Sequence, residues 1–179
     1  MKYIILLIQL LSSASFASPD ESWNIGESSG EPDMVMGKII NIDINKNAIG
    51  SWAILYPSRY GDHSKIGIIF KKWEGEDAEK CKGNPLHDRK SLGMRLTKIA
   101  DAWIKLDVSC VAMPRKEQPS HTDYYSHYSP QTLGDLNSLI KIFIESNYVT
   151  VQNFSYSAKN FRKTYNTYAA RLGYPIKYR

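Results

Sequence analysis

The stretch 101–113, DAWIKLDVSCVAM, shows the clearest alternation of apolar and polar side chains in this 179-residue chain. Its apolar side chains occupy every second position, and they are Ala102, Ile104, Leu106, Val108, Cys110 and Ala112. The side chains between them are Trp103, Lys105, Asp107 and Ser109. A period of two residues predicts a β-strand with one buried face. The strand is longer than usual, so we expect a bend or a bulge within it.

Four segments upstream of this strand also have strand character. They are 38–44, 51–56, 65–73 and 92–96. Because residues 45–50 between the first two segments are turn-like, these two are predicted to pair as a hairpin. The third is predicted to be a strand with Ile66, Ile68 and Phe70 on one face, and the fourth to be a short strand.

A helix is predicted to follow the strands. Thr132 and Asp135 are spaced as in a capping box, ahead of an apolar run with helical spacing that continues to about Glu145. The apolar side chains of this run are Leu133, Leu136, Leu139, Ile140 and Phe143. Residues 148–156 return to strand character.

A second helix is predicted at the end of the chain, with Ser157 as its cap and Gly173 and Pro175 as its stop signals. The predicted order is β-β-β-β-β-α-β-α. Regular βαβ alternation, which a doubly wound parallel fold needs, is missing from the first 110 residues. The sequence therefore predicts a β-rich α+β fold with an antiparallel β-sandwich-like body and two helices in the C-terminal half.

Residues 1–17 have the layout of a secretory signal peptide. Lys2 precedes an apolar run at 3–11, and the small residues Ser15 and Ala17 occupy the −3 and −1 positions of a cleavage site. A transmembrane anchor needs about 20 apolar residues, which is far more than this run provides. We therefore expect a periplasmic or secreted protein that is cleaved after Ala17.

The next segment, 18–34, carries five acidic residues and no basic one. It has no apolar period, so we expect a flexible acidic lead-in, which Trp23 and Ile25 could pin against the domain. Residues 35–179 are predicted to form a single globular β-rich domain.

Cys81 and Cys110 are the only cysteines of the chain. In an oxidising compartment a lone pair of cysteines most often forms a disulfide. The bond would close a segment of about 30 residues, worth around 3–4 kcal/mol in the chain-entropy model. The alternative, a thiol nucleophile, lacks an adjacent CxxC partner and a recognisable signature. We therefore predict a structural disulfide.

Residues 113–131, MPRKEQPSHTDYYSHYSPQ, lack periodicity and are predicted to form a long loop, which in a compact domain is often functional. The side chains best suited to contact a partner are His121, Tyr124, Tyr125 and Tyr128. One alternative is a metal site of His121, Asp123 and His127, whose ligand types suit zinc but whose spacing matches no known motif. Another is a partly packed loop without a function.

The formal net charge is +5, and residues 141–179 hold one acidic and seven basic residues. The predicted last helix has a basic face, whose residues are Lys159, Arg162, Lys163 and Arg171. Such a face can touch anionic lipid or polysaccharide, with Arg162 and Lys163 as contact residues, and the alternative is a solvated surface. Because an exported protein seldom meets nucleic acid, no nucleic-acid partner is expected.

Short stretches in the C-terminal half resemble the small exported bacterial proteins of the invasion-associated locus B type. The stretches are VSCVA at 108–112, the helix from Thr132, the strand 149–154, and SAKNF at 157–161. The chain departs from that family in the segment 113–131 and at Asn160, where the family tends to have glycine. The resemblance implies a non-enzymatic envelope or surface protein, and it transfers no catalytic residue.

The sequence contains no GxSxG, HExxH, P-loop or GxGxxG motif. We therefore expect a non-catalytic exported protein of the bacterial envelope or surface, which recognises a protein or an envelope polymer and uses no cofactor. One alternative is a periplasmic immunity or inhibitor protein that neutralises a toxin or hydrolase. A further alternative is a secreted hydrolase that uses His121 or His127.

Overall fold

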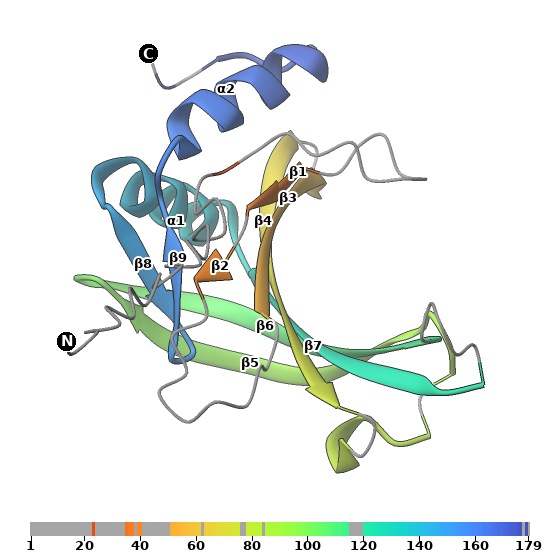
Figure 1. The fold of residues 1–179 in the computed structure, drawn as a ribbon. Coiled ribbons are helices and arrows are strands. Elements are labelled where there is room, and N and C mark those ends of the chain that lie inside the picture. Colours follow the sequence, from red (N-terminus) through yellow and green to blue (C-terminus); the bar gives the residue numbers. More distant parts are fainter. Residues whose placement is uncertain are drawn as a thin grey trace, which may run out of the picture.

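The computed structural model describes residues 23, 35–37, 39–40, 51–61, 63–75, 78–83, 85–114, 120–176 and 178. These residues form two β-sheets and two α-helices (Figure 1). The strands are β1 (Val35–Gly37), β2 (Ile39–Ile40), β3 (Ser51–Tyr60), β4 (His63–Gly75), β5 (Arg89–Ile99), β6 (Ala102–Pro114), β7 (Thr122–Pro130), β8 (Tyr148–Val151) and β9 (Phe154–Ser157). The helices are α1 (Leu133–Glu145), α2 (Phe161–Arg171) and the short 3-10 helix η1 (Glu79–Cys81).

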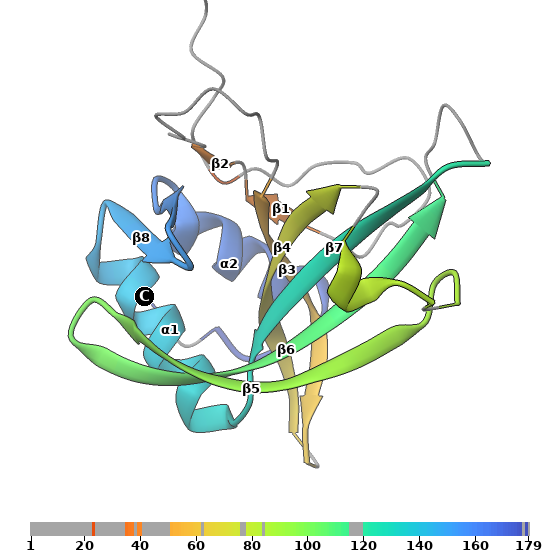
Figure 2. The same ribbon diagram turned by 90° about the horizontal axis from the view of Figure 1, so that it is seen from below.

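The larger sheet has six strands in the order β1-β3-β4-β7-β6-β5, and the smaller has three in the order β2-β9-β8. All neighbouring strands in both sheets are antiparallel. The larger sheet is strongly curved, and α1 packs against β6 and β7 on its concave side (Figures 1 and 2). The predicted β-rich α+β class is confirmed, but the body is not a closed sandwich. The small sheet is too short to cover the large one, so α1 and α2 supply much of the second layer of the core.

Strand β6 confirms the alternation that predicted it. Ile104 and Leu106 are fully buried, whereas Trp103, which directly precedes Ile104, is 64% exposed. The expected bulge lies in the partner strand, because the register of β5 against β6 shifts between Ser91 and Gly93. Gly93 has a φ of +91°, which is a backbone conformation that favours glycine.

The predicted long loop at 113–131 is wrong for most of its length. Strand β7 occupies Thr122–Pro130 and pairs with β4 on one side and with β6 on the other. It lies inside the sheet although both of its faces carry Tyr and Ser, and one of them also His127, rather than aliphatic side chains. Residues 115–119 of the segment lie outside the described residues.

The predicted capping box at the start of α1 is confirmed. Thr132 Oγ1 accepts the Asp135 backbone N–H at 3.1 Å, and the Asp135 carboxylate accepts the Thr132 backbone N–H at 3.3 Å. The same carboxylate accepts the Lys105 backbone N–H at 2.9 Å. Asp135 therefore caps the helix and ties it to β6.

Two predictions about the last part of the chain are wrong. Residues 148–156 form the hairpin β8–β9 rather than one strand, because Gln152 and Asn153 turn the chain with φ values of 50° and 68°. Ser157 ends β9, and the residue that precedes α2 as its cap is Asn160. Gly173, with a φ of 68°, follows the helix as its sequence position predicts.

The N-terminal predictions are only partly within the described residues. Ile39 and Ile40 of the segment 38–44 pair with β9, and β1 takes the place beside β3, so the predicted pairing with 51–56 is wrong. Trp23, one of the two residues expected to pin the segment 18–34, lies in the core at 2% exposed. Ile25, residues 41–50 and the predicted signal peptide lie outside the described residues.

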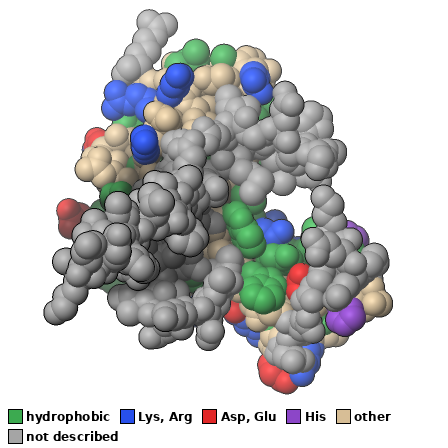
Figure 3. All heavy atoms as spheres, in the orientation of Figure 1, with side chains coloured by type: hydrophobic (Ala, Val, Ile, Leu, Met, Phe, Trp, Pro, Cys, Tyr) green, Lys and Arg blue, Asp and Glu red, His purple; other side chains and the backbone are tan. Residues whose placement is uncertain are grey.

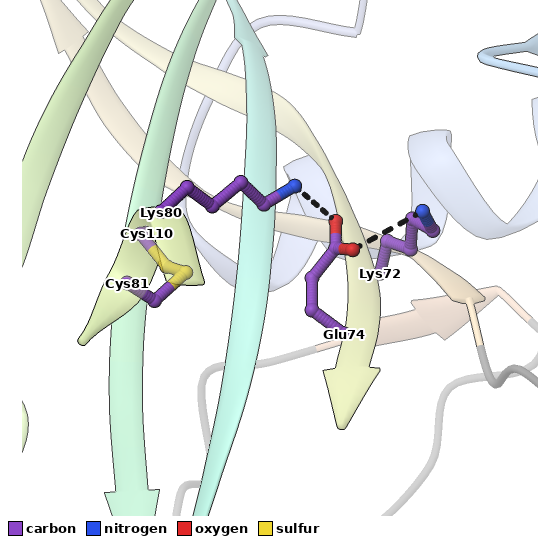
Figure 4. Close-up of a disulfide and its surroundings, with 5 residues drawn as sticks. All are labelled: Lys72, Glu74, Lys80, Cys81 and Cys110. Atoms are coloured by element: carbon purple, nitrogen blue, oxygen red, sulfur yellow. Dashed lines mark hydrogen bonds and ion pairs between the residues drawn. A yellow bond between two sulfur atoms is a disulfide. The ribbon is translucent and has the colours of Figure 1, made fainter. Parts of the chain in front are cut away.

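The predicted disulfide between Cys81 and Cys110 is present, and both residues are fully buried. It joins η1 to the face of β6 that also carries Ile104 and Leu106, and the two Cα atoms are 5.7 Å apart (Figure 4).

Replacing both cysteines by alanine is expected to lower the free energy of unfolding by about 3 kcal/mol, because the unfolded chain loses its covalent loop. Urea denaturation of the oxidised wild type and the double variant measures this loss. A loss below about 1 kcal/mol, or free thiols in the denatured unreduced wild type, would contradict the structural role.

Candidate functional site

The β5–β6 hairpin extends beyond the rest of the large sheet (Figure 2). Strand β7 pairs with β6 only from Leu106 to Pro114, whereas β5 follows β6 back to Ala102. Beyond the end of β7 the hairpin is held by the chain around the start of α1, where the Gln131 backbone N–H donates to the Lys105 carbonyl at 2.9 Å. One face of the hairpin therefore packs toward α1, and the other faces away from it.

Three large apolar side chains lie on the face that points away from α1. Met94 is 53% exposed, Leu96 is 52% exposed and Trp103 is 64% exposed. They are neighbours, because the register places Met94 opposite Asp107, Leu96 opposite Lys105, and Lys98 opposite Trp103. Single exposed apolar residues are common, whereas a contiguous group of them marks an interaction site. We call Met94, Leu96, Lys98, Trp103 and Lys105 the outer hairpin surface.

This surface lies on a basic strand. The eleven residues of β5 include four basic side chains and no acidic one. Arg95 points to the other face, where its Nη1 donates to Gln152 Oε1 at 2.7 Å, and Gln152 Nε2 donates to Thr97 Oγ1 at 3.1 Å. These bonds hold the β8–β9 turn against β5, so they fix the hairpin from the side opposite Leu96.

The structure does not bring the predicted contact residues into one surface. Tyr124 and Tyr125 are half-buried at adjacent positions of β7, whose side chains point to opposite faces, and His121 is exposed just before the strand. Tyr128 is only 6% exposed and belongs to the core. The two remaining residues, Arg162 and Lys163, are exposed on α2, over which Figure 3 shows several basic side chains.

The sequence contained one signal for the outer hairpin surface. Trp103 stands on the otherwise polar face of β6, between the solvated Asp101 and Lys105. A large aromatic on a polar face becomes informative when other exposed apolar side chains adjoin it, as Met94 and Leu96 do here. That signal points to this hairpin, whereas the aromatic residues of β7 are accounted for by their place inside the sheet.

A second cluster lies on the outer face of the sheet centre, with Tyr125 in its middle. Lys71 Nζ is 3.9 Å from the centroid of the Tyr125 ring, and the Trp52 and Tyr125 ring centroids are 6.1 Å apart. Arg89 Nη2 is 3.4 Å from His127 Nδ1. Burial, and then the positive charges of Lys71 and Arg89, lower the pKa of His127 to about 3. A histidine with so low a pKa is a poor general base at neutral pH.

The carboxylate of Glu74 joins two lysines near the disulfide (Figure 4). Lys80 Nζ donates to one oxygen at 2.7 Å and Lys72 Nζ to the other at 3.2 Å. Burial alone would raise the pKa of Glu74, but its hydrogen bonds and the two positive charges hold that pKa below its usual value. Because both lysines are more exposed than Glu74, the cluster is a surface ion-pair network that covers the disulfide end of the sheet.

A groove of about 540 Å³ lies between the end of β3 and the start of α1. Its lining includes Tyr56, Arg59, Tyr60 and Asp107. Tyr60 Oη donates to the Pro130 carbonyl at 3.1 Å, and burial raises the pKa of this phenol above its usual value. None of the described residues that line the groove is a histidine or a cysteine.

Within the described part of the chain, no three His, Cys, Asp or Glu side chains are grouped closely enough to hold a metal ion. His121, Asp123 and His127 are thus not assembled into a ligand set there. The helices among these described residues are also all too short or too polar to cross a membrane. Comparison of the chain with protein-family models, curated proteins and solved structures finds no match.

Proposed function

We propose that this chain is an exported, non-catalytic binding protein of a bacterial envelope or surface, which recognises another protein through the outer hairpin surface. The observation that carries the proposal is the exposure of Trp103 at 64%, beside Met94 and Leu96 at about half exposure. Tryptophan is enriched among the residues that contribute most to binding at protein interfaces. Burying these three side chains under a partner would remove a contiguous apolar group from water.

The proposed location is supported by the N-terminal sequence and by the disulfide. The chain begins with the layout of a signal peptide, and the disulfide Cys81–Cys110 is consistent with an oxidising compartment outside the cytoplasm. At Asn160, where the resemblance to the invasion-associated locus B type breaks down, φ is 63°. Glycine adopts this left-handed conformation readily and asparagine tolerates it, so the backbone there is compatible with either residue.

The chemistry of His127 supports the proposal of a non-catalytic role. His127 accepts a hydrogen bond from Arg89 and has a pKa of about 3, so its imidazole is uncharged and only weakly basic at neutral pH. The arrangement suits a structural contact within the sheet better than acid–base catalysis.

Capture from the envelope of the producing bacterium tests the proposal. The exported chain and its Leu96→Ser/Trp103→Ser variant are immobilised and incubated with detergent-solubilised envelope, and bound proteins are quantified by mass spectrometry. We expect one protein that the wild type enriches and the double variant does not. When that protein is purified and titrated, the variant should bind it roughly 30-fold more weakly, because two central apolar contacts contribute about 2 kcal/mol.

Tyr148→Ser provides the matched control, since Tyr148 is 55% exposed on β8 and lies outside the outer hairpin surface. This variant should bind the partner as the wild type does, and all three proteins should have similar melting temperatures. Equal binding by wild type and double variant would reject the surface. A partner that is itself a toxin or hydrolase, inhibited on binding, would identify the chain as an immunity or inhibitor protein.

A further inference from the structure

Strand β5 ends the large sheet, and nothing in the described residues pairs with its outer edge. It runs for eleven residues, Arg89–Ile99, which is about twice the usual length of a strand. The backbone N–H and C=O groups along the outer edge of such a strand can hydrogen-bond to an added strand from another chain. Proteins usually protect an edge by keeping it short, bulged or charged.

Two of these protections are present in β5, and they leave part of the strand open. The bulge at Ser91–Gly93 disrupts the first part of the strand, and the pairing with β6 is regular from Gly93 to Ile99. Charge disfavours pairing of β5 with the β5 strand of a second copy of the chain. The strand carries four basic side chains and no acidic one, so two paired copies of β5 would bring like charges together, which destabilises a sheet.

The same charges favour a strand of opposite sign. Lys90 and Lys98 are exposed and point to opposite faces of β5 on either side of the bulge, and Arg95 lies between them in the sequence. Met94 and Leu96 are exposed on the same face as Lys98, and Arg95 lies between them in the sequence but on the opposite face. A strand beside them gains most when its side chains are aliphatic next to Met94 and Leu96 and acidic next to the cations.

Building on the proposed function, we propose that the partner binds by adding an acidic extended segment, with aliphatic side chains at alternate positions, to the free edge of β5. Met94 and Leu96 then lie beside the aliphatic side chains of the added strand, and Trp103, one strand further into the sheet on the same face, extends this apolar group. The main-chain hydrogen bonds supply affinity, and the cations and the apolar group select the sequence.

Selection of short peptides on the exported chain tests this mode of binding. The probe is a random library of displayed 12-residue peptides, and the most enriched peptide is synthesised and titrated by fluorescence anisotropy. We expect enriched peptides to be acidic and to alternate acidic with aliphatic residues. In the complex, hydrogen exchange of the amides in 89–99 should slow about tenfold, whereas exchange in β3 should not change.

Charge reversal gives a sharper readout. The Lys90→Glu/Lys98→Glu variant should bind the acidic peptide about tenfold more weakly than the wild type does. A peptide with lysines in place of the acidic residues should bind this variant better than it binds the wild type. Arg95 is left in place because it is bonded to Gln152. Lys159→Glu, a reversal of an exposed lysine that lies just before α2, is the control and should bind like the wild type.

Several results would overturn this mode of binding. They are enriched peptides without acidic residues, unchanged exchange in β5, or failure of charge reversal to switch the preference. Binding to phosphatidylglycerol vesicles, lost on Trp103→Ser, with no peptide selected, would assign the surface to a membrane instead. If the envelope partner still depends on Leu96 and Trp103 in any of the first three cases, the proposed function stands and only the strand addition fails.

Discussion

Replacing Trp23 by alanine is expected to lower the free energy of unfolding by about 4 kcal/mol, as truncation of a buried aromatic residue does. Trp23 is 2% exposed and its ring meets Phe143 of α1 and Phe161 of α2 edge to face, with centroid distances of 5.5 and 4.9 Å. Its Nε1–H donates to the Ser157 carbonyl at 2.6 Å. The substitution therefore opens a cavity and leaves a buried carbonyl without its donor.

The backbone of Trp23 adds to this role. Its N–H donates to the Lys159 carbonyl at 3.0 Å, and its carbonyl accepts from Thr164 Oγ1 at 3.0 Å. These bonds remain available in the alanine variant, so the loss should reflect the side chain. Urea denaturation at pH 7, with the slope compared between proteins, measures the difference.

Trp103→Ala is the matched control, because it removes the same side chain from a site that is 64% exposed. Its free energy of unfolding should stay within about 0.5 kcal/mol of the wild type. Equal losses in the two variants would show that Trp23 is not a core residue. A large loss for Trp103→Ala would show that the outer hairpin surface is covered by the chain itself and is not open to a partner.

The elements that the sequence predicts correctly are those in which one face is aliphatic and the other polar. Strand β6 is one example, since Ile104 and Leu106 face α1 while Lys105 and Asp107 face solvent. Helix α1 is another, because a capping box and a helical apolar spacing agree on its start and its buried face. In both, local preference and tertiary burial point the same way.

Strand β7 could not be predicted in this way, because its contacts come from strands on both sides. Tyr125 and Tyr128 point to opposite faces and both are packed, so no two-residue apolar period arises. Tyrosine buries its ring while keeping a polar group, which makes a packed strand look like a polar loop in the sequence. The β8–β9 turn was missed for a related reason, since Gln152 and Asn153 adopt positive φ without a glycine to signal it.

The outer hairpin surface depends on the order of strands in the sheet. The segment containing Met94 and Leu96 is recognisable as a strand, but an interior strand with the same residues would bury them. Only the order β1-β3-β4-β7-β6-β5 places this strand at an edge. That order results from long-range pairing of β7 between β4 and β6, for which no local signal exists.

Acidification is expected to destabilise the folded chain through His127, by up to about 1.4 kcal/mol for each pH unit. The folded-state pKa of this histidine is about 3, whereas the unfolded chain has the ordinary value of about 6.5. Between these two values the unfolded chain binds a proton that the folded chain does not. The free energy of unfolding therefore falls as the pH falls from 6.5 toward 3, by on the order of 4 kcal/mol over the whole window.

His127→Asn removes this titration and keeps a polar side chain that can accept from Arg89. Urea denaturation of both proteins at pH 7, 6, 5 and 4 gives the free energy of unfolding as a function of pH. This free energy should fall more steeply for the wild type than for His127→Asn, so that the variant gains stability relative to the wild type at each lower pH. The acid sensitivity that comes from Glu74 is common to both proteins and cancels in their difference. His121→Asn, at the exposed histidine before β7, should follow the wild type at every pH. Parallel curves for wild type and His127→Asn would show that the folded chain binds the proton as readily as the unfolded one, and that Lys71 and Arg89 do not hold the imidazole uncharged.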